Sequence, residues 1–249
     1  MNTTEPAPYQ FLEWDTNFFG FRIGRANINR LDNAALTLLQ QWQRENQIQC
    51  LYFLANADDR DTIALAEQVG FHLVEVRLIF ERSLKDWQPQ SRPIAAQGVI
   101  IRPAQKADVP ALQEIAKNSY IDSRFYFDRR FPESKWQEYY AFWVKKSCEG
   151  GAELALVAEM DGEIVGYITS QVDRAKGEAM YELTGVKESA RRLGVGQELF
   201  RSGLDWFVQQ GISYVWLATQ GRNVATQRMV QRNGFITRAC QLYYHKWFD

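Results

Sequence analysis

Cysteine and histidine are scarce in this chain of 249 residues. Three cysteines and two histidines are present, with no CxxC pair, so neither a disulfide framework nor a metal site is supported. Cys50, Cys148 and Cys240 are instead expected to be small core residues, because free cysteine is among the most buried residue types.

An excess of charge of one sign and a long apolar run are also missing. The 29 Lys and Arg residues against 30 Asp and Glu residues leave a net charge of -1, so no overall field favours nucleic acid or an anionic membrane as partner. No uninterrupted apolar stretch approaches the roughly 18 residues of a membrane span, and the first residues do not resemble a secretory signal. We therefore expect a cytoplasmic protein, whose hydrophobic content of 46% is ample for a packed core.

Residues 84–98 are polar, contain two prolines and lack helical or strand periodicity, which is typical of a linker. They separate a first part, residues 1–83, from a second part, residues 99–249. In the first part we expect strands at 9–12, 18–28, 49–55 and 72–83, and helices at 33–45 and 61–69. In the second part we expect strands at 98–104, 152–160, 163–172, 179–186, 212–218 and 237–248, with helices beginning near Asp108, Ser134, Gly194 and Asn223. This alternation predicts an α/β fold.

The two parts share a pattern. Gly70-Phe71 and Gly234-Phe235 lie 164 residues apart, and at that offset a strand, a helix and a final strand coincide without gaps. Either the first part is a degenerate copy of the second, or two unrelated αβ units are alike by chance.

The most informative stretch is VKESARRLGVGQEL, residues 186–199, which joins a strand to a helix through Arg191-x-x-Gly194-x-Gly196. Glycines at a helix N-terminus let the backbone approach an anion, and the free N–H groups with the helix dipole favour a pyrophosphate. The segment lacks the Gly-Lys-Ser/Thr of a P-loop and the third glycine of a dinucleotide fingerprint. A tight strand-to-helix turn without a ligand is the alternative.

Five features follow one another in a fixed order along the chain. They are Glu182 on the strand before that loop, the loop itself, the apolar strand after its helix, Asn223 and the Gly234-Phe235 corner. The set resembles the GCN5-related N-acetyltransferase (GNAT) family over residues 100–248. The resemblance implies a mixed sheet with helices on both faces, preceded here by a smaller degenerate GNAT-like domain, and acetyl-CoA as co-substrate without a metal. WDTNFFGF, SRFYFDRRFP and LATQGRN add a similarity to bacterial dTDP-fucosamine acetyltransferases, which acetylate an amino group of a dTDP-linked sugar.

The resemblance assigns the cofactor site residue by residue. The strand end would bind the pantetheine arm and offer an N–H to the thioester oxygen, the loop would hold the pyrophosphate, and Asn223 would bond the pantetheine amides. These residues are Thr184, Gly185, Val186, Arg191, Arg192, Leu193, Gly194, Val195, Gly196 and Asn223. Asn223 could equally cap its helix, and both roles are compatible.

Glu182 is the candidate general base for the attacking amine. It lies four residues before Val186 on one strand, so both side chains are expected on one side of the sheet. An exposed carboxylate paired with a cation is the alternative.

Val230 departs from the family pattern. It lies two helical turns after Asn223, on a face expected to look at the cofactor near its sulfur, where many relatives have a tyrosine that protonates the leaving thiolate. The general acid therefore stays open. The candidates are a water held by Thr226 and Gln227, or the tyrosines Tyr243 and Tyr244.

The segment SRFYFDRRFPESKW, residues 123–136, mixes arginines with aromatic residues where this fold places its acceptor. Arg124, Tyr126, Arg129 and Arg130 are the candidate substrate-binding residues, because arginine suits a diphosphate and aromatic rings suit a base or a sugar face. A solvated loop over a small apolar cluster would look similar. WDTNFFGF either completes the same pocket or fills the core of the first part.

These observations predict an N-acetyltransferase that acts on a primary amine, with the amino group of a nucleotide-linked amino-deoxy sugar as the expected acceptor. A peptide or small-metabolite amine as acceptor, and a weakly catalytic CoA-binding regulatory module, are the alternatives. A homodimer is one of the oligomeric states left open.

Overall fold

The computed structural model describes residues 7–89 and 98–248. Their strands form one sheet in the order β1-β2-β3-β10-β4-β9-β8-β7-β6-β5. The sheet is mixed, since β2–β3 and β8–β9 are parallel pairs and the other pairs are antiparallel. The strands are β1 Tyr9–Phe11, β2 Ile23–Ala26, β3 Cys50–Asn56, β4 His72–Ser83, β5 Val99–Pro103, β6 Leu154–Met160, β7 Glu163–Asp173, β8 Glu178–Val186, β9 Tyr214–Gln220 and β10 Ile236–Trp247.

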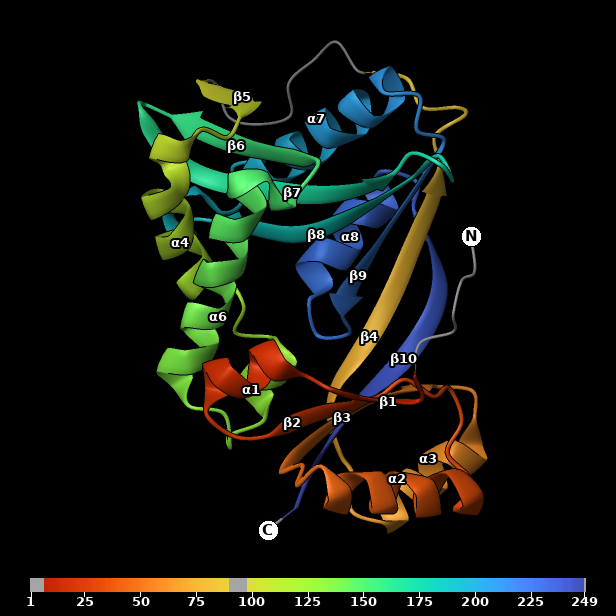
Figure 1. Ribbon diagram of the computed structural model, residues 1–249. Helices are drawn as coiled ribbons and strands as arrows, with labels where there is room; N and C mark the ends of the chain where they lie inside the picture. Colours follow the sequence, from red (N-terminus) through yellow and green to blue (C-terminus); the bar gives the residue numbers. More distant parts are fainter. Residues whose placement is uncertain (1–6, 90–97, 249) are drawn as a thin grey trace.

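Helices cover both faces of this sheet, as the sequence predicts (Figure 1). The α-helices are α1 Glu13–Phe19, α2 Asn33–Glu45, α3 Arg60–Gln68, α4 Val109–Lys117, α5 Arg124–Phe127, α6 Glu133–Lys146, α7 Val195–Gln209 and α8 Val224–Arg232, with short 3-10 turns at Lys106–Asp108 and Glu188–Ala190 and a π turn at Ser147–Gly151. Around β6–β9, α4 and α6 lie on one face and α7 and α8 on the other. Around β3 and β10, α2 and α3 cover one face and α1 with α6 the other. The α/β fold class is confirmed.

The offset of 164 residues seen in the sequence relates three pairs of elements with the same bounds: β3 to β9, α3 to α8 and β4 to β10. The helix caps correspond as well, because Asp59 accepts a hydrogen bond from the Thr62 N–H and Asn223 accepts one from the Thr226 N–H. Gly70 and Gly234 both take the left-handed conformation after their helices, with φ of 84° and 74°. The recurrence is therefore structural. Two finer expectations stay predictions: that the first part is a degenerate GNAT-like domain, and that residues 84–98 divide the chain into two domains.

The final strands of the two repeats are exchanged. β10 pairs with β3 and β4, and β4 pairs with β10 and β9, so each final strand lies between the two strands of the other repeat (Figure 1). Arg77 lies opposite Gln241, its own equivalent at the offset of 164, and the Arg77 guanidinium donates to Gln241 Oε1 at 3.1 Å. This crossing is the centre of an approximate two-fold arrangement, and it joins both parts of the chain in one sheet.

Two expectations, one about residues 18–28 and one about Cys240, need correction. Residues 18 and 19 belong to α1 rather than to a strand over residues 18–28, because Glu13 and Asp15 suit the first turn of a helix that ends at Gly20 in the left-handed conformation. Phe19 is 5% exposed and packs into the core, so WDTNFFGF fills the core. Cys240 is exposed on β10 and is not a core residue, while Cys50 is buried. The strand faces alternate, and no helix covers Cys240.

The first residues of the expected linker pack against the second part. Leu84 and Trp87 are buried with the side chains around β8, β9 and α7, and the Trp87 indole donates to Asp205 Oδ1 at 2.6 Å. Residues 90–97 lie outside the described residues. The part of the linker that is described is therefore attached to the second part.

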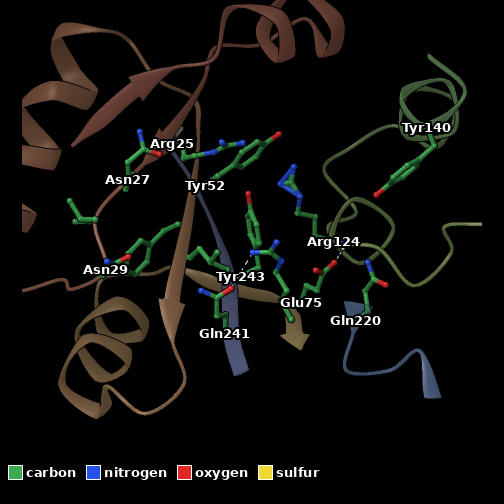
Figure 2. A pocket seen from close by; sticks show the side chains of 15 residues that line it. Arg25, Asn27, Asn29, Tyr52, Glu75, Arg124, Tyr140, Gln220, Gln241 and Tyr243 are labelled. Carbon is green, nitrogen blue, oxygen red and sulfur yellow. Dashed lines mark hydrogen bonds between the residues drawn. The ribbon is translucent and has the colours of Figure 1, made fainter. Parts of the chain in front are cut away.

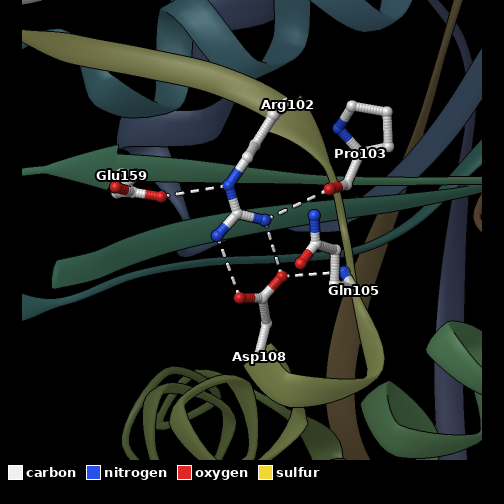
Figure 3. Close-up of polar contacts among 5 residues, drawn as sticks. All are labelled: Arg102, Pro103, Gln105, Asp108 and Glu159. Atoms are coloured by element: carbon white, nitrogen blue, oxygen red, sulfur yellow. Dashed lines mark hydrogen bonds and ion pairs between the residues drawn. The ribbon is translucent and has the colours of Figure 1, made fainter. Parts of the chain in front are cut away.

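An ion-pair network fixes the start of α4. Arg102 on β5 donates to both carboxylate oxygens of Asp108, at 2.8 and 3.0 Å, and to Glu159 on β6 at 3.0 Å (Figure 3). The Gln105 N–H donates to the same Asp108 carboxylate. A helix is expected to begin near Asp108, and an aspartate at that position often caps the helix with its side chain, but the Asp108 side chain makes no cap hydrogen bond to α4. It joins α4 to the sheet instead, and this helix forms a wall of the site.

Candidate active site

The sheet opens between β8 and β9. These strands pair only from Glu178 opposite Tyr214 to Tyr181 opposite Leu217, although both continue for several residues. Within the described residues, the β8 segment from Glu182 to Val186 therefore has no strand partner on its β9 side. Its backbone groups on that side face the opening, where an extended ligand can bond them, although the Val186 carbonyl accepts from Arg191 Nε at 3.3 Å.

The loop after β8 ends at a helix N-terminus that no side chain caps. Gly194 takes the left-handed conformation with φ of 81° directly before α7, and no hydrogen bond from a side chain caps that helix. Arg192 is also left-handed, with φ of 67°. The first-turn N–H groups of α7 and the positive end of its dipole therefore remain available, with Arg191 and Arg192 beside them.

A cavity of about 550 Å³ adjoins this loop. It is lined by Ile115 on α4, by Ser119 just after that helix, and by Val186, Lys187 and Arg191. Gly185 faces the end of α4 so closely that a Cβ atom there would lie 3.0 Å from both Ile115 and Ser119. The strand end, the loop and α4 together line one groove.

Glu182 lies on a β-bulge. Tyr181 and Thr184 on β8 face Ser170 and Ile168 on β7, so β8 carries one extra residue at this point. The Leu183 N–H inside the bulge donates to the Thr169 hydroxyl at 3.3 Å. The extra residue reverses the alternation: Val186 packs with the core under α7, whereas Glu182 faces α6. The expectation that Glu182 and Val186 share a side of the sheet is therefore wrong.

Glu182 faces a cavity of about 250 Å³ with Arg124, Tyr139, Tyr140 and Trp143. Burial raises the pKa of the Glu182 carboxyl above its usual value, against a hydrogen bond from Gln171 Nε2 at 3.1 Å that lowers it. No ion pair of Glu182 is found in the described part of the chain. A carboxylate with a raised pKa at a cavity wall can accept a proton from a substrate.

The α8 residues divide into two groups. Asn223 caps the helix, as its alternative role predicts, and Gln227 donates to the Gln220 and Gly221 carbonyls at the end of β9. Val230 is 0% exposed and belongs to the core cluster with Leu199 and Phe235. The structure therefore shows a packing role for Val230 rather than a place on the open surface of the groove.

The two tyrosine candidates on β10 lie on opposite faces. Tyr244 is fully buried under α3, with its hydroxyl 3.4 Å from Glu67 Oε1, so it cannot reach the opening between β8 and β9. Tyr243 lines a cavity on the face that Glu182 also occupies. The alternation along one strand separates the two residues.

Of the four candidate acceptor residues, only Arg124 lines one of the described cavities. Tyr126 is 46% exposed, Arg129 is exposed, and Arg130 stacks on Trp247 with 4.5 Å between its guanidinium carbon and the ring centre. Phe125, Phe131 and Trp136 fill a core cluster. A role of Tyr126, Arg129 and Arg130 in binding substrate stays a prediction.

A further cavity of about 500 Å³ lies over β2, β3, β10, β4 and β9, and it shares Arg124 and Tyr140 with the cavity of Glu182 (Figure 2). Sequence reasoning missed most of its polar residues because they come from five strands and the loop after β2, without a common motif. They are Arg25, Asn27, Asn29, Tyr52, Glu75, Arg77, Gln220, Gln241 and Tyr243. The only sequence signal was the alternation of Glu75 and Arg77 with apolar residues on one strand.

Comparison with known proteins decides the family. The model of the acetyltransferase (GNAT) family matches residues 111–235, half of the chain. The chain belongs to this family. A dTDP-fucosamine acetyltransferase of Escherichia coli O6:H1 is 25% identical over 90% of this chain and 92% of its own. A spore coat polysaccharide biosynthesis protein of Bacillus subtilis is 27% identical over 58% of this chain and 50% of its own.

Solved structures agree on the fold. A GCN5-related N-acetyltransferase from Sphaerobacter thermophilus has a TM-score of 0.68 at 18% identity, covering 96% of this chain and 76% of its own. A tandem GNAT protein from the clavulanic acid biosynthesis pathway has a TM-score of 0.60 at 14% identity, covering 90% and 75%. This GNAT chain is therefore an acyltransferase of the N-acetyltransferase type, in a family that uses acetyl-CoA as co-substrate.

Two features are absent from residues 7–89 and 98–248. No group of three or more potential metal ligands is present among them. None of their helices is both long enough and apolar enough to cross a membrane.

Proposed function

We propose that this GNAT chain transfers the acetyl group of acetyl-CoA to the primary amine of a nucleotide-linked amino-deoxy sugar. The observation that carries the proposal is the opening between β8 and β9, which has an uncapped helix N-terminus at one end and the Glu182 cavity at its bulge. The donor and the acceptor would thus meet at the bulge of β8. A cytoplasmic location stays a prediction.

The cofactor residues predicted from the sequence support the donor side. The loop from Arg191 to Gly196 would hold the diphosphate of acetyl-CoA, and backbone groups of residues 184–186 would bond the pantetheine arm and the thioester oxygen. Asn223 can bond a pantetheine amide while it caps α8. Bound acetyl-CoA supplies an activated acyl group for attack by an amine.

Glu182 would prepare that amine. An ammonium group has no free electron pair, so the attacking nitrogen must lose a proton. Glu182 lies at the cavity wall with a pKa raised by burial, and its carboxylate can accept the proton directly or through a water. No side chain is assigned as the acid, because the leaving thiol has a pKa near 8.5 and is a tolerable leaving group near neutral pH.

The acceptor class rests on two supports. The dTDP-fucosamine acetyltransferase is similar over nearly the full length of both chains, including the first part of this one. The cavity of Glu182 shares Arg124 and Tyr140 with a larger polar cavity that has room for more than an amine. A peptide or small-metabolite amine would leave that second space without a role.

The test is release of CoA thiol from acetyl-CoA in the presence of a panel of amines. The proposal expects turnover with a dTDP-linked 4-amino-4,6-dideoxyhexose and much less with lysine peptides or free amino sugars. Turnover only on peptides or metabolites would favour the alternative that the acceptor is a peptide or small-metabolite amine. CoA binding without turnover on any amine would favour a regulatory CoA-binding module.

A further inference from the structure

The larger cavity, over β2, β3, β10, β4 and β9, carries more positive than negative charge. Arg25, Arg77 and Arg124 line it together with a single carboxylate, Glu75 (Figure 2). Glu75 accepts the backbone N–H of Arg124 at 3.0 Å rather than its guanidinium. Within the described residues, none of the three guanidinium groups takes part in an ion pair. The cavity is therefore electrostatically incomplete without an anion.

Two polar atoms at this cavity are buried and have no hydrogen-bond partner among residues 7–89 and 98–248. Tyr52 is 0% exposed, yet its hydroxyl makes no hydrogen bond, and Nη1 of Arg124 is likewise buried and unpartnered. Buried polar groups are nearly always hydrogen-bonded, because leaving one unbonded destabilises the fold. Figure 2 shows the side chains of Tyr52, Arg124, Arg25 and Tyr243 converging on one space.

These groups are held in place before any ligand arrives. The Arg124 guanidinium stacks on Tyr52, Phe125 and Tyr243, with 4.1 to 4.5 Å from its carbon to each ring centre. Arg77 is held by Gln241 at the crossing of the exchanged strands. Rigid donors lose little entropy when they bind, so they form a site rather than a flexible charged surface.

We propose that this cavity binds the diphosphate of the acceptor, with Arg77, Arg124 and the Tyr52 hydroxyl as its donors. This rests on the proposed function. A diphosphate carries two negative charges and several acceptor oxygens. It therefore matches two guanidinium groups and a hydroxyl better than a ligand with one carboxylate would. The shared wall of Arg124 and Tyr140 directs the sugar end toward Glu182. The exchanged strands thus make the first part of the chain a component of the acceptor site.

The test is calorimetric titration of dTDP, a diphosphate probe that lacks the reacting amine, into the full-length protein. Arg77→Ala is expected to weaken dTDP binding by about 10- to 100-fold, because a charge-assisted hydrogen bond is lost. Arg60→Ala is the matched control, because the Arg60 side chain is 94% exposed on α3, and it should leave dTDP affinity unchanged.

Tyr52→Phe separates binding from folding. Its hydroxyl bonds nothing in the free protein, so its removal should keep or raise the melting temperature while it weakens dTDP binding. Tyr181→Phe is the contrast: the Tyr181 hydroxyl donates to the Phe200 carbonyl at 2.6 Å, so this variant should melt earlier and bind dTDP as before.

CoA also contains a diphosphate, so dTDP is titrated again with saturating CoA. Unchanged dTDP affinity supports two separate sites, whereas displacement by CoA overturns the proposal. Absence of dTDP binding, or equal affinity in wild type, Arg77→Ala and Tyr52→Phe, overturns it as well. These outcomes leave the proposed function intact if the protein still acetylates an amine. The proposed function itself is refuted if no amine causes release of CoA thiol.

Discussion

Replacing Glu182 by glutamine removes the proposed proton acceptor with little change in shape. The amide oxygen can still accept the hydrogen bond from Gln171 Nε2, which is 3.1 Å long in the wild type. Glu182 is exposed to its cavity, so no buried ion pair is broken. We therefore expect Glu182→Gln to fold with the wild-type melting temperature and to bind CoA normally.

The expected loss is in the rate. General base catalysis by a positioned side chain contributes about 10²- to 10⁴-fold, so kcat should fall by that factor near neutral pH. The pH dependence follows from the raised pKa. In the wild type the carboxyl becomes protonated as the pH falls through that value, which lies above the ordinary pKa of a glutamic acid, and kcat falls with it. The variant should lack this acidic limb.

The assay is thiol release under saturating substrates across the pH range, for wild type, Glu182→Gln and Gln171→Ala. Removal of the Gln171 hydrogen bond takes away an interaction that lowers the pKa of Glu182, so Gln171→Ala should move the acidic limb to higher pH and keep its alkaline plateau. A Glu182→Gln enzyme that loses less than about tenfold in kcat and keeps the wild-type acidic limb would show that another group is the base.

Three further predictions concern the donor loop, α8 and a buried histidine. Gly194→Asp should weaken CoA binding, measured by calorimetry, because it puts a side chain and a negative charge at a left-handed position before α7. Gly211→Ala is the control: it changes a glycine with φ of 75° at the other end of that helix, so it should lower stability but bind CoA normally. Val230→Tyr should overpack the core and reduce stability by about 1–3 kcal/mol with an unaltered pH profile of kcat; a shifted alkaline limb without loss of stability would return Val230 to the groove. Burial lowers the pKa of His245 from 6.5 to about 4, despite the 2.7 Å contact of its Nδ1 with Asp128 Oδ2. As the pH falls, the unfolded chain therefore takes up a proton at His245 before the folded protein does. The free energy of unfolding should fall by about 3 kcal/mol between pH 6.5 and 4. Urea unfolding at several pH values should show this slope in the wild type and a shallower one in His245→Gln.

Local patterns in the sequence sufficed for most elements. The helix at residues 33–45 was predicted with its observed bounds. Asp161-Gly162 separates the strands expected at 152–160 and 163–172, an Asp-Gly pair there favours a hairpin, and both residues have positive φ between the antiparallel strands β6 and β7. The offset of 164 residues also holds for strands, helices and caps. Periodicity, caps and turns depend on neighbours within a few positions, so they can be read along the chain.

The candidate site was predicted in part for the same reason. The loop from Arg191 to Gly196 is contiguous, and its function depends on a helix start that the sequence marks with glycines. WDTNFFGF misled the prediction because its aromatic residues suit a buried strand as well as a helix. Which of the two forms is decided by packing against α6, which is distant in the sequence.

Tertiary structure alone decided how the two parts are joined and what the acceptor side contains. No pattern along the chain tells that β4 and β10 cross between the repeats, because strand pairing depends on hydrogen bonds between distant segments. One extra residue in β8 turns Glu182 away from Val186, and only its pairing with β7 reveals it. Arg77, Tyr52 and Arg124 come from separate elements, and they meet in one cavity because the exchanged strands bring both parts of the chain to the same face of the sheet.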